Sequence, residues 1–244
     1  MIALRPPVKN GGKFFLHKWI LEHFPEDYQS MSYCEPFCAG ASVFLNKEAS
    51  SEEMISDSDP GVIAIFKALR DEPKEFISKI KKTHYKESTF EKALNTTQFN
   101  DYIDHAVNEF LLRQLSQGGR KLKFSASEPS AKLAQHLKTI SKRLQNTTIL
   151  QADFRDIIKV WDEETTLFYF DPPYMRNEPR PNDMTADDHM NLLNFCKTVR
   201  GKVVISSRCS TLYNHHLTEW KSYRKTVRFQ GKRKRHVECL WTNY

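Results

Sequence analysis

The fold is decided by residues 167–174, which read LFYFDPPY. The apolar run 166–170 is typical of a strand buried inside a parallel sheet. An acid, two prolines and an aromatic residue follow it directly. Because ligands of open α/β sheets bind where parallel strands end, this stretch predicts the mouth of a binding site.

The four residues Asp171, Pro172, Pro173 and Tyr174 suit a base that carries an exocyclic amino group. Prolines have a fixed φ and no N–H, so their carbonyls stay available as acceptors. The Asp171 carboxylate and the Pro172 carbonyl can each accept one amino hydrogen, which makes the nitrogen lone pair more nucleophilic. Tyr174 can stack on the base. The competing interpretation is an ordinary proline turn that begins with Asp.

Strand and helix patterns alternate on both sides of this stretch, which indicates an α/β domain with a parallel sheet. We expect strands ending at Pro36 and over 54–57, 148–150, 166–170 and 202–206, and helices over 14–24, from 43, 62–70 and 188–198. Residues 226–229 and 237–242 predict a hairpin. Between about 73 and 145 the patterns are helical and charged, so this block reads as a helical insertion.

Acidic, small and aromatic residues at other predicted strand ends suit a nucleoside cofactor with a positive centre. Small residues around Gly40 let backbone approach a ligand, Glu35 suits a sulfonium, and Asp57 suits ribose hydroxyls. Asp153 and Phe154 can hold an adenine ring by a hydrogen bond and stacking. The alternatives are a plain turn before a helix for the first block and a helix cap for Asp57.

Composition sets outer limits on the function. The chain has 244 residues, 39% of them hydrophobic, and a formal net charge of +7. That charge suggests a polyanionic partner, nucleic acid first, although a basic protein without one fits equally well. We expect no membrane span and no metal site. Five cysteines without a C-x-x-C pair predict neither a disulfide framework nor a zinc ribbon, which fits a reducing compartment.

These blocks together resemble the Dam-type (D12 class) family of DNA adenine methyltransferases, including its phage members. The likeness rests on the DPPY block and on Glu-Pro-Phe-x-x-Gly at 35–40, and it continues at 10–13, 55–59, 113–118, 152–155 and 238–243. It implies a Rossmann-like methyltransferase sheet, with residues 1–72 and 146–244 as the catalytic domain and 73–145 as an inserted target-recognition domain.

The resemblance also implies S-adenosylmethionine as the cofactor and methylation of the adenine amino group in double-stranded DNA. The cofactor-binding residues that it implies are Asn10, Lys13, Glu35, Phe37, Gly40, Asp57, Asp153, Phe154 and Asp171. The DNA-binding residues are Arg113, Gln117, Arg120, Lys121, Lys123, Lys232, Arg233 and Lys234. For the lysines and arginines the competing interpretation is a solvated loop or hairpin tip.

Departures from the family leave two alternatives open. Ala39 and Ala41 stand where the family has more glycine, which keeps a DNA-binding protein without catalysis in view. Methylation of the cytosine amino group would use the same geometry, although Ser is more usual there than Asp171. Ser116 and Gln117 replace Phe and Asn of the family, so the target sequence does not carry over. We expect a cytoplasmic monomer, with a restriction endonuclease considered as a biological partner.

Overall fold

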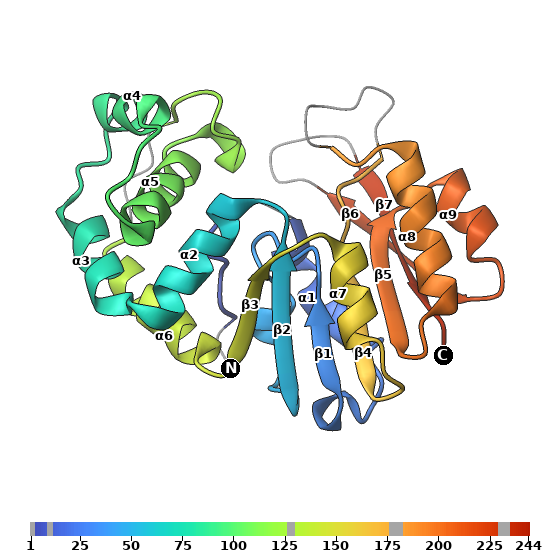
Figure 1. The fold of residues 1–244 in the computed structure, drawn as a ribbon. Coiled ribbons are helices and arrows are strands. Elements are labelled where there is room, and N and C mark those ends of the chain that lie inside the picture. The colour runs from blue at the N-terminus through green and yellow to red at the C-terminus, as the bar shows by residue number, and fades with distance from the viewer. Residues whose placement is uncertain (1–2, 9–11, 126–129, 176–182, 229–234) are drawn as a thin grey trace. The chain divides into compact units, whose positions relative to one another are not determined.

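The computed structural model describes residues 3–8, 12–125, 130–175, 183–228 and 235–244 (Figure 1). Its strands are β1 Ser32–Glu35, β2 Glu52–Asp57, β3 Thr147–Gln151, β4 Thr166–Phe170, β5 Lys202–Arg208, β6 Lys221–Arg228 and β7 Arg235–Thr242. Its α-helices are α1 His17–Leu21, α2 Pro60–Asp71, α3 Pro73–Lys82, α4 Glu87–Asn95, α5 Tyr102–Gln114, α6 Leu133–Leu144, α7 Phe154–Trp161, α8 Ala186–Thr198 and α9 Thr211–His216.

Within the described residues the strands form one seven-stranded sheet in the order β3-β2-β1-β4-β5-β7-β6. β4 pairs in parallel with β1 and β5, and every residue of β4 is buried. β7 runs antiparallel to β5 and to β6. The predicted buried strand, the α/β class and the closing hairpin are therefore confirmed, with the hairpin tip outside the described residues.

The chain divides into two compact units, and each is described by itself. The first unit comprises Met1–Glu22, Cys38–Glu48 and Ile55–Gln151. The second comprises His23–Phe37, Ala49–Met54 and Ala152–Tyr244. Helices α3–α6 thus belong to a larger unit that also holds α2, while the boundaries 73–145 for a recognition domain stay a prediction.

In the second unit, α7 and α8 lie on the same face of the sheet (Figure 1) and help to build the core. That core gathers aromatic side chains from strands and helices, among them Phe168, Phe170, Phe154 and Trp241. α8 begins at a capping box, because Thr185 accepts from the Asp188 N–H and Asp188 accepts from the Thr185 N–H. α7 and α9 are helices that the sequence patterns did not predict.

In the first unit, Asp59 caps α2 by accepting from the N–H groups of Gly61 and Val62, and Pro60 starts the helix. Phe76 of α3 and Phe110 of α5 pack edge to face, with ring centroids 5.7 Å apart.

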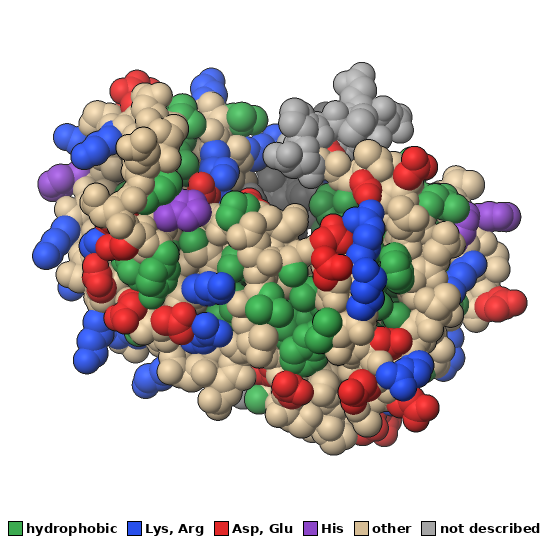
Figure 2. Space-filling view, viewed as in Figure 1, with side chains coloured by type: hydrophobic (Ala, Val, Ile, Leu, Met, Phe, Trp, Pro, Cys, Tyr) green, Lys and Arg blue, Asp and Glu red, His purple; other side chains and the backbone are tan. Residues whose placement is uncertain are grey.

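On the face in Figure 2, acidic and basic side chains are interspersed, so the positive net charge forms no single patch there.

Two expectations from the sequence are wrong. The segment from Val43 forms only a short 3-10 helix, Phe44–Asn46, where a helix was predicted to begin. Cys209 and Cys239 are joined in a disulfide, although the cysteine spacing predicted none. The antiparallel register of β5 and β7 sets Ser207 opposite Cys239, and this brings cysteines 30 residues apart to a Cα separation of 5.2 Å.

No described helix is long and apolar enough to cross a bilayer.

Gly201, just before β5, sits where a side chain would collide with the sheet. An added Cβ would lie 2.7 Å from the Thr166 carbonyl oxygen and 3.0 Å from that of Glu163. We predict that Gly201→Ala lowers the free energy of unfolding by about 1–3 kcal/mol, as overpacking does. Urea denaturation of the purified protein measures this. Asn194→Ala, on the exposed side of α8, is the control and should change stability by less than about 0.5 kcal/mol. An equally mild effect at Gly201 would contradict the prediction.

Candidate active site

The carboxylate of Asp171 leaves the end of β4 in a fixed orientation. Ser206, fully buried on β5, donates its hydroxyl hydrogen to Asp171 Oδ1 at 3.0 Å, and the Tyr169 hydroxyl lies 2.8 Å from Ser206 Oγ. Since Ser206 has one hydrogen and gives it to Asp171, Tyr169 must be the donor to Ser206. Burial and then the nearby Asp171 charge raise the pKa of Tyr169 well above its usual value, so this hydroxyl keeps its proton.

Tyr174 is held from two sides. Its hydroxyl donates to the Glu238 carboxylate, with both oxygens at 3.2 Å, and Glu238 is fully buried on β7. The Arg208 guanidinium carbon lies 4.8 Å from the centre of the Tyr174 ring, within cation–π range. Arg208 and Glu238 are direct partners across β5 and β7. The strand pairing therefore sets the position of the tyrosine ring.

Glu35 is the last residue of β1, and Phe37 follows it in the same unit. Tyr33 donates to Glu35 Oε2 at 2.6 Å, and both side chains are buried. The partly exposed Phe37 ring packs on Phe154 at 5.2 Å and on Phe170 at 6.3 Å. Phe154 is itself in the core, so Phe37 is the ring of the two that offers more surface to a ligand.

Asp153 has a structural role that the sequence did not predict. It caps α7 by accepting from the Arg155 N–H, and its other oxygen pairs with the Arg155 guanidinium at 2.9 Å. Its side chain is exposed at the start of the helix.

In the first unit, Asp57 ends β2 and accepts two backbone N–H groups. The Ala39 N–H donates to Oδ2 at 2.8 Å, and the Asp59 N–H donates to Oδ1 at 2.9 Å. Because Asp59 caps α2, the capping role considered for Asp57 belongs to Asp59. Burial raises the pKa of Asp57, and the two backbone hydrogen bonds offset part of that rise.

The turn beside Asp57 uses alanines in a conformation that favours glycine. Ala39 has φ of 42° and Ala41 has φ of 51°, with the buried Gly40 between them. Lys13 is also in this unit, buried in the 3-10 helix Gly12–Phe15. Asn10 lies outside the described residues.

The basic loop after α5 presents only some of its predicted DNA contacts. Gln117, Arg120 and Lys123 are exposed, whereas Lys121 pairs with Glu109 at 2.9 Å. The expectation for Arg113 needs correction, because its side chain has 0% exposure and is ion-paired inside the unit, so it offers no surface to a phosphate. Lys232, Arg233 and Lys234 lie outside the described residues.

Four side chains near these positions escaped the sequence analysis: Ser206, Arg208, Glu238 and Leu122. Glu238 opens the carboxyl-terminal block 238–243, which was the one signal that pointed to it. Leu122 is 79% exposed in the basic loop. Ser206 and Arg208 could not be found from the sequence, since only strand pairing brings them to Asp171 and Tyr174.

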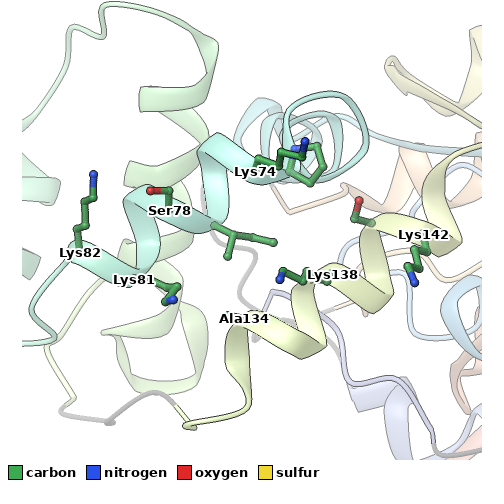
Figure 3. A pocket seen from close by; sticks show the side chains of 10 residues that line it. Lys74, Ser78, Lys81, Lys82, Ala134, Lys138 and Lys142 are labelled. Atoms are coloured by element: carbon green, nitrogen blue, oxygen red, sulfur yellow. The ribbon is translucent and has the colours of Figure 1, made fainter.

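A separate cavity of about 670 Å³ lies between α3 and α6 (Figure 3) and contains none of the predicted site residues. Its lining is Pro73, Lys74, Ile77, Ser78, Lys81, Lys82, Ala134, Lys138, Ser141 and Lys142.

No group of His, Cys, Asp and Glu in the described part of the chain is arranged to hold a metal ion.

The strand order, with its antiparallel β7, and the polar residues at the end of β4 define a methyltransferase of the α/β class. The profile of the D12 class N6 adenine-specific DNA methyltransferases matches residues 10–234, and the chain belongs to this family. It is an adenine-specific DNA methyltransferase.

Relatives agree with this assignment. A DNA adenine methylase of Vibrio cholerae is 25% identical over 231 residues, covering 85% of this chain and 82% of the relative. The type II methyltransferase M.MjaIII of Methanocaldococcus jannaschii is 25% identical over 271 residues, covering 94% and 91%. An rRNA methylase structure from Streptococcus thermophilus aligns over 95% of this chain and 97% of that chain, at 9% identity and a TM-score of 0.41, which carries no functional argument.

The positive φ of Ala39 leads to a stability prediction. A left-handed conformation costs an alanine about 1–2 kcal/mol, and glycine costs about 0.5–1 kcal/mol in chain entropy. Ala39→Gly should therefore raise the free energy of unfolding by about 0.5–1 kcal/mol. Ala64→Gly inside α2 should instead lower it by about 1 kcal/mol. Urea denaturation of both variants compares the signs, and a loss of stability at Ala39 would refute the strain.

The contact between Tyr174 and Glu238 leads to a kinetic prediction. Tyr174→Phe keeps the ring but loses a hydrogen bond to a buried carboxylate, so the single-turnover rate should fall by about 5- to 30-fold. Cofactor affinity in calorimetry should stay within about twofold, because Tyr174 is not among the residues expected to bind the cofactor. Tyr223→Phe, whose ring stacks on His23, is the control and should keep the wild-type rate. A wild-type rate in Tyr174→Phe would remove the positioning role of Glu238.

Proposed function

We propose that Asp171 and the Pro172 carbonyl each accept one hydrogen of the adenine amino group, after the base has been flipped out of duplex DNA. The observation that carries this is the Ser206 hydrogen bond, which holds the Asp171 carboxylate at the end of a fully buried strand. Tyr174 stacks on the base, and Pro173 stiffens the turn. A carboxylate that is already oriented needs no reorganisation when positive charge develops on the nitrogen.

The residues fit S-adenosylmethionine as the cofactor. A carboxylate offers about four acceptor positions, and the described backbone contacts of Asp57 use one position on each oxygen. Asp57 can therefore accept the ribose hydroxyls as well. The partly exposed Phe37 suits the adenine ring, with Phe154 packed behind it, and the small residues around Gly40 add little side-chain bulk beside Asp57.

Other residues complete the proposed cofactor set. The buried Glu35 carboxylate favours a sulfonium, while Asn10 and Lys13 follow the family motif at the amino terminus. Asp153 is exposed at the start of α7 and can accept from an adenine amino group.

When bound, the cofactor would supply an electrophilic methyl group: the bond from that methyl to sulfur would break, and the sulfur would leave as the neutral thioether of S-adenosylhomocysteine. The chain's own contribution is to hold the base, orient its nitrogen lone pair and accept charge. The amino nitrogen gains a methyl group and must lose one proton, and Asp171 is placed to receive it. Catalysis then rests on positioning and electrostatics.

We further propose that the exposed Gln117, Arg120 and Lys123 contact duplex DNA, with Lys121 beside them. The exposed Leu122 suits contact with base edges. The hairpin residues Lys232, Arg233 and Lys234 are proposed to hold phosphates. We propose that residues 73–145 form the recognition domain and that the protein is a monomer. We also propose that it acts in the cytoplasm of a bacterial or phage-infected host cell, with a restriction endonuclease as a candidate biological partner.

Replacement of Asp171 tests the catalytic assignment. Asp171→Ala should lower the single-turnover rate of methyl transfer at least about 100-fold, the cost of roughly 3 kcal/mol of transition-state stabilisation. Binding of S-adenosylhomocysteine, measured by calorimetry, should survive. The control is Asp156→Ala, which removes an exposed carboxylate of α7 that pairs with Lys159. A near-normal rate in Asp171→Ala would sink the assignment.

Sequencing that detects modified bases, applied to DNA from cells expressing the chain, identifies the base and the target sequence together. We expect N6-methyladenine within one recurring motif in wild-type cells and none in cells expressing Asp171→Ala. Methylated cytosine in place of adenine would overturn the proposed base.

A further inference from the structure

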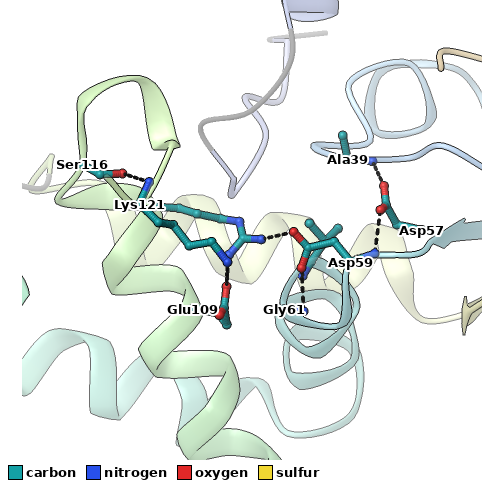
Figure 4. A network of polar contacts seen from close by, with 9 residues as sticks. Ala39, Asp57, Asp59, Gly61, Glu109, Ser116 and Lys121 are labelled. Carbon is teal, nitrogen blue, oxygen red and sulfur yellow. Dashed lines mark hydrogen bonds and ion pairs between the residues drawn. The ribbon is translucent and has the colours of Figure 1, made fainter. Parts of the chain in front are cut away.

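A chain of polar contacts in the first unit begins at Asp57 (Figure 4). The Ala39 and Asp59 N–H groups fix the two oxygens of the Asp57 carboxylate. The Asp59 side chain, besides capping α2, pairs with the Arg113 guanidinium of α5 at 2.6 Å. Asp57, the residue proposed to bind the ribose, is therefore linked to Arg113 through Asp59, whose N–H contacts Asp57 and whose carboxylate contacts Arg113.

The chain continues from Arg113 into the basic loop. Arg113 also pairs with Glu109, one turn earlier on α5, and Glu109 pairs with the Lys121 ammonium at 2.9 Å. The Lys121 N–H donates to Ser116 Oγ at 2.9 Å. The Glu109 carboxylate thus lies between two cations, one buried in the unit and one in the loop.

The surrounding structure is adapted to this carboxylate. A Cβ added at Gly61 would clash with the Glu109 side chain, so glycine at the second position of α2 leaves room for Glu109 in its present position. Arg113 is completely buried, and its Nε has no hydrogen-bond partner among the described residues. A buried guanidinium depends on its carboxylate partners, because an unpaired charge there is strongly destabilising.

The loop itself is held in an unfavourable conformation. Lys121 has φ of 59°, in the left-handed region, and Gly118 and Gly119 also have positive φ. Non-glycine residues keep such a conformation only where contacts over-determine it. For Lys121 those contacts are the Ser116 hydroxyl and Glu109.

We propose that Glu109 and Asp59 are positioning residues that couple the two ligands. Through Arg113 they connect the segment carrying Asp57 to the loop 116–123, so that cofactor and DNA each strengthen the binding of the other. This inference rests on the proposed function, in which Asp57 holds the cofactor and the loop contacts DNA.

The physical basis is shared ordering. A ligand on Asp57 restrains the Asp59 backbone, which carries the carboxylate that holds Arg113. Arg113 and Glu109 then hold Lys121 and with it the loop. A second ligand that needs the ordered loop no longer bears that entropy cost, which gives positive cooperativity without a large movement.

Charge supports the link at Asp59. Partial burial raises the pKa of Asp59. Arg113, Lys121 and the two capping N–H groups together lower it by more than burial raises it, so the pKa lies below the ordinary aspartate value. Asp59 is thus ionised at neutral pH and attracts both the buried arginine and the loop lysine.

The test is a thermodynamic cycle on the full chain. Calorimetry gives the dissociation constant of S-adenosylhomocysteine with and without a saturating duplex that contains the motif found by modified-base sequencing. The ratio of the two constants is the coupling factor, and linkage requires the same factor for DNA with and without the cofactor product. We expect about fivefold or more in the wild type.

The decisive variants are Asp59→Asn and Glu109→Gln. Asparagine still caps a helix, so Asp59→Asn removes the charge at Arg113 while keeping α2 intact. In both variants the coupling factor should fall to near one, while the affinity of the free protein for S-adenosylhomocysteine changes by less than about threefold. The double variant should lose nothing more, because both residues act in one network.

The matched control is Asp101→Asn. Asp101 caps α5 in the same unit by accepting from the Asp104 N–H, so this variant makes the same chemical change at another helix start. It should keep the wild-type coupling factor. If Glu109→Gln fails to fold, Asp59→Asn decides alone.

The outcomes separate the two proposals. Coupling that survives in Asp59→Asn, or a wild-type factor of one with both ligands bound, overturns the network and leaves the proposed function standing. Failure of the wild type to bind S-adenosylhomocysteine overturns the proposed function and this inference with it.

Discussion

The complete burial of β4 between two parallel neighbours is the constraint on which the candidate active site depends. Its backbone is paired on both sides and all five of its side chains are buried, so Asp171 is the first residue after the buried strand. The same pairing brings Ser206 of β5 to the Asp171 carboxylate. One feature, a strand enclosed by its neighbours, therefore both places the Asp171 carboxylate at the end of the strand and orients it.

The strands beyond β5 extend this principle. β7 runs antiparallel and sets Glu238 opposite Arg208, and the two side chains hold Tyr174 by its hydroxyl and its ring face. In the first unit an ion pair has the corresponding role, because the buried Arg113 guanidinium pairs with Asp59, which caps α2, and with Glu109 of α5. Hydrogen-bonded strands position Asp171 and Tyr174, and an ion-pair network around the buried Arg113 holds Lys121 of the basic loop.

The sequence predicted the elements with strong local signals. The sequence identified the apolar run of β4, the acid that ends β2, the helix α2 and the helical character of the block that holds α3, α5 and α6. Weak signals failed for a physical reason: α7 and α9 have only 8 and 6 residues, too few turns for a clear period. A helix was predicted from residue 43 because apolar residues follow a stretch of small ones, and so short an apolar run does not separate a 3-10 turn from an α-helix.

By itself the sequence determined the class of sheet, the family, and the carboxylates at the strand ends, since each depends on neighbours in the chain or on a local motif. Only the tertiary structure decided what those side chains touch. Arg113, expected on DNA from its motif, is buried and paired with Asp59, the cap of α2, which lies 54 residues earlier in the chain. Cys209 meets Cys239 through strand register. Burial and charge pairing are properties of the packed chain, because they depend on which distant residues displace water from a given side chain.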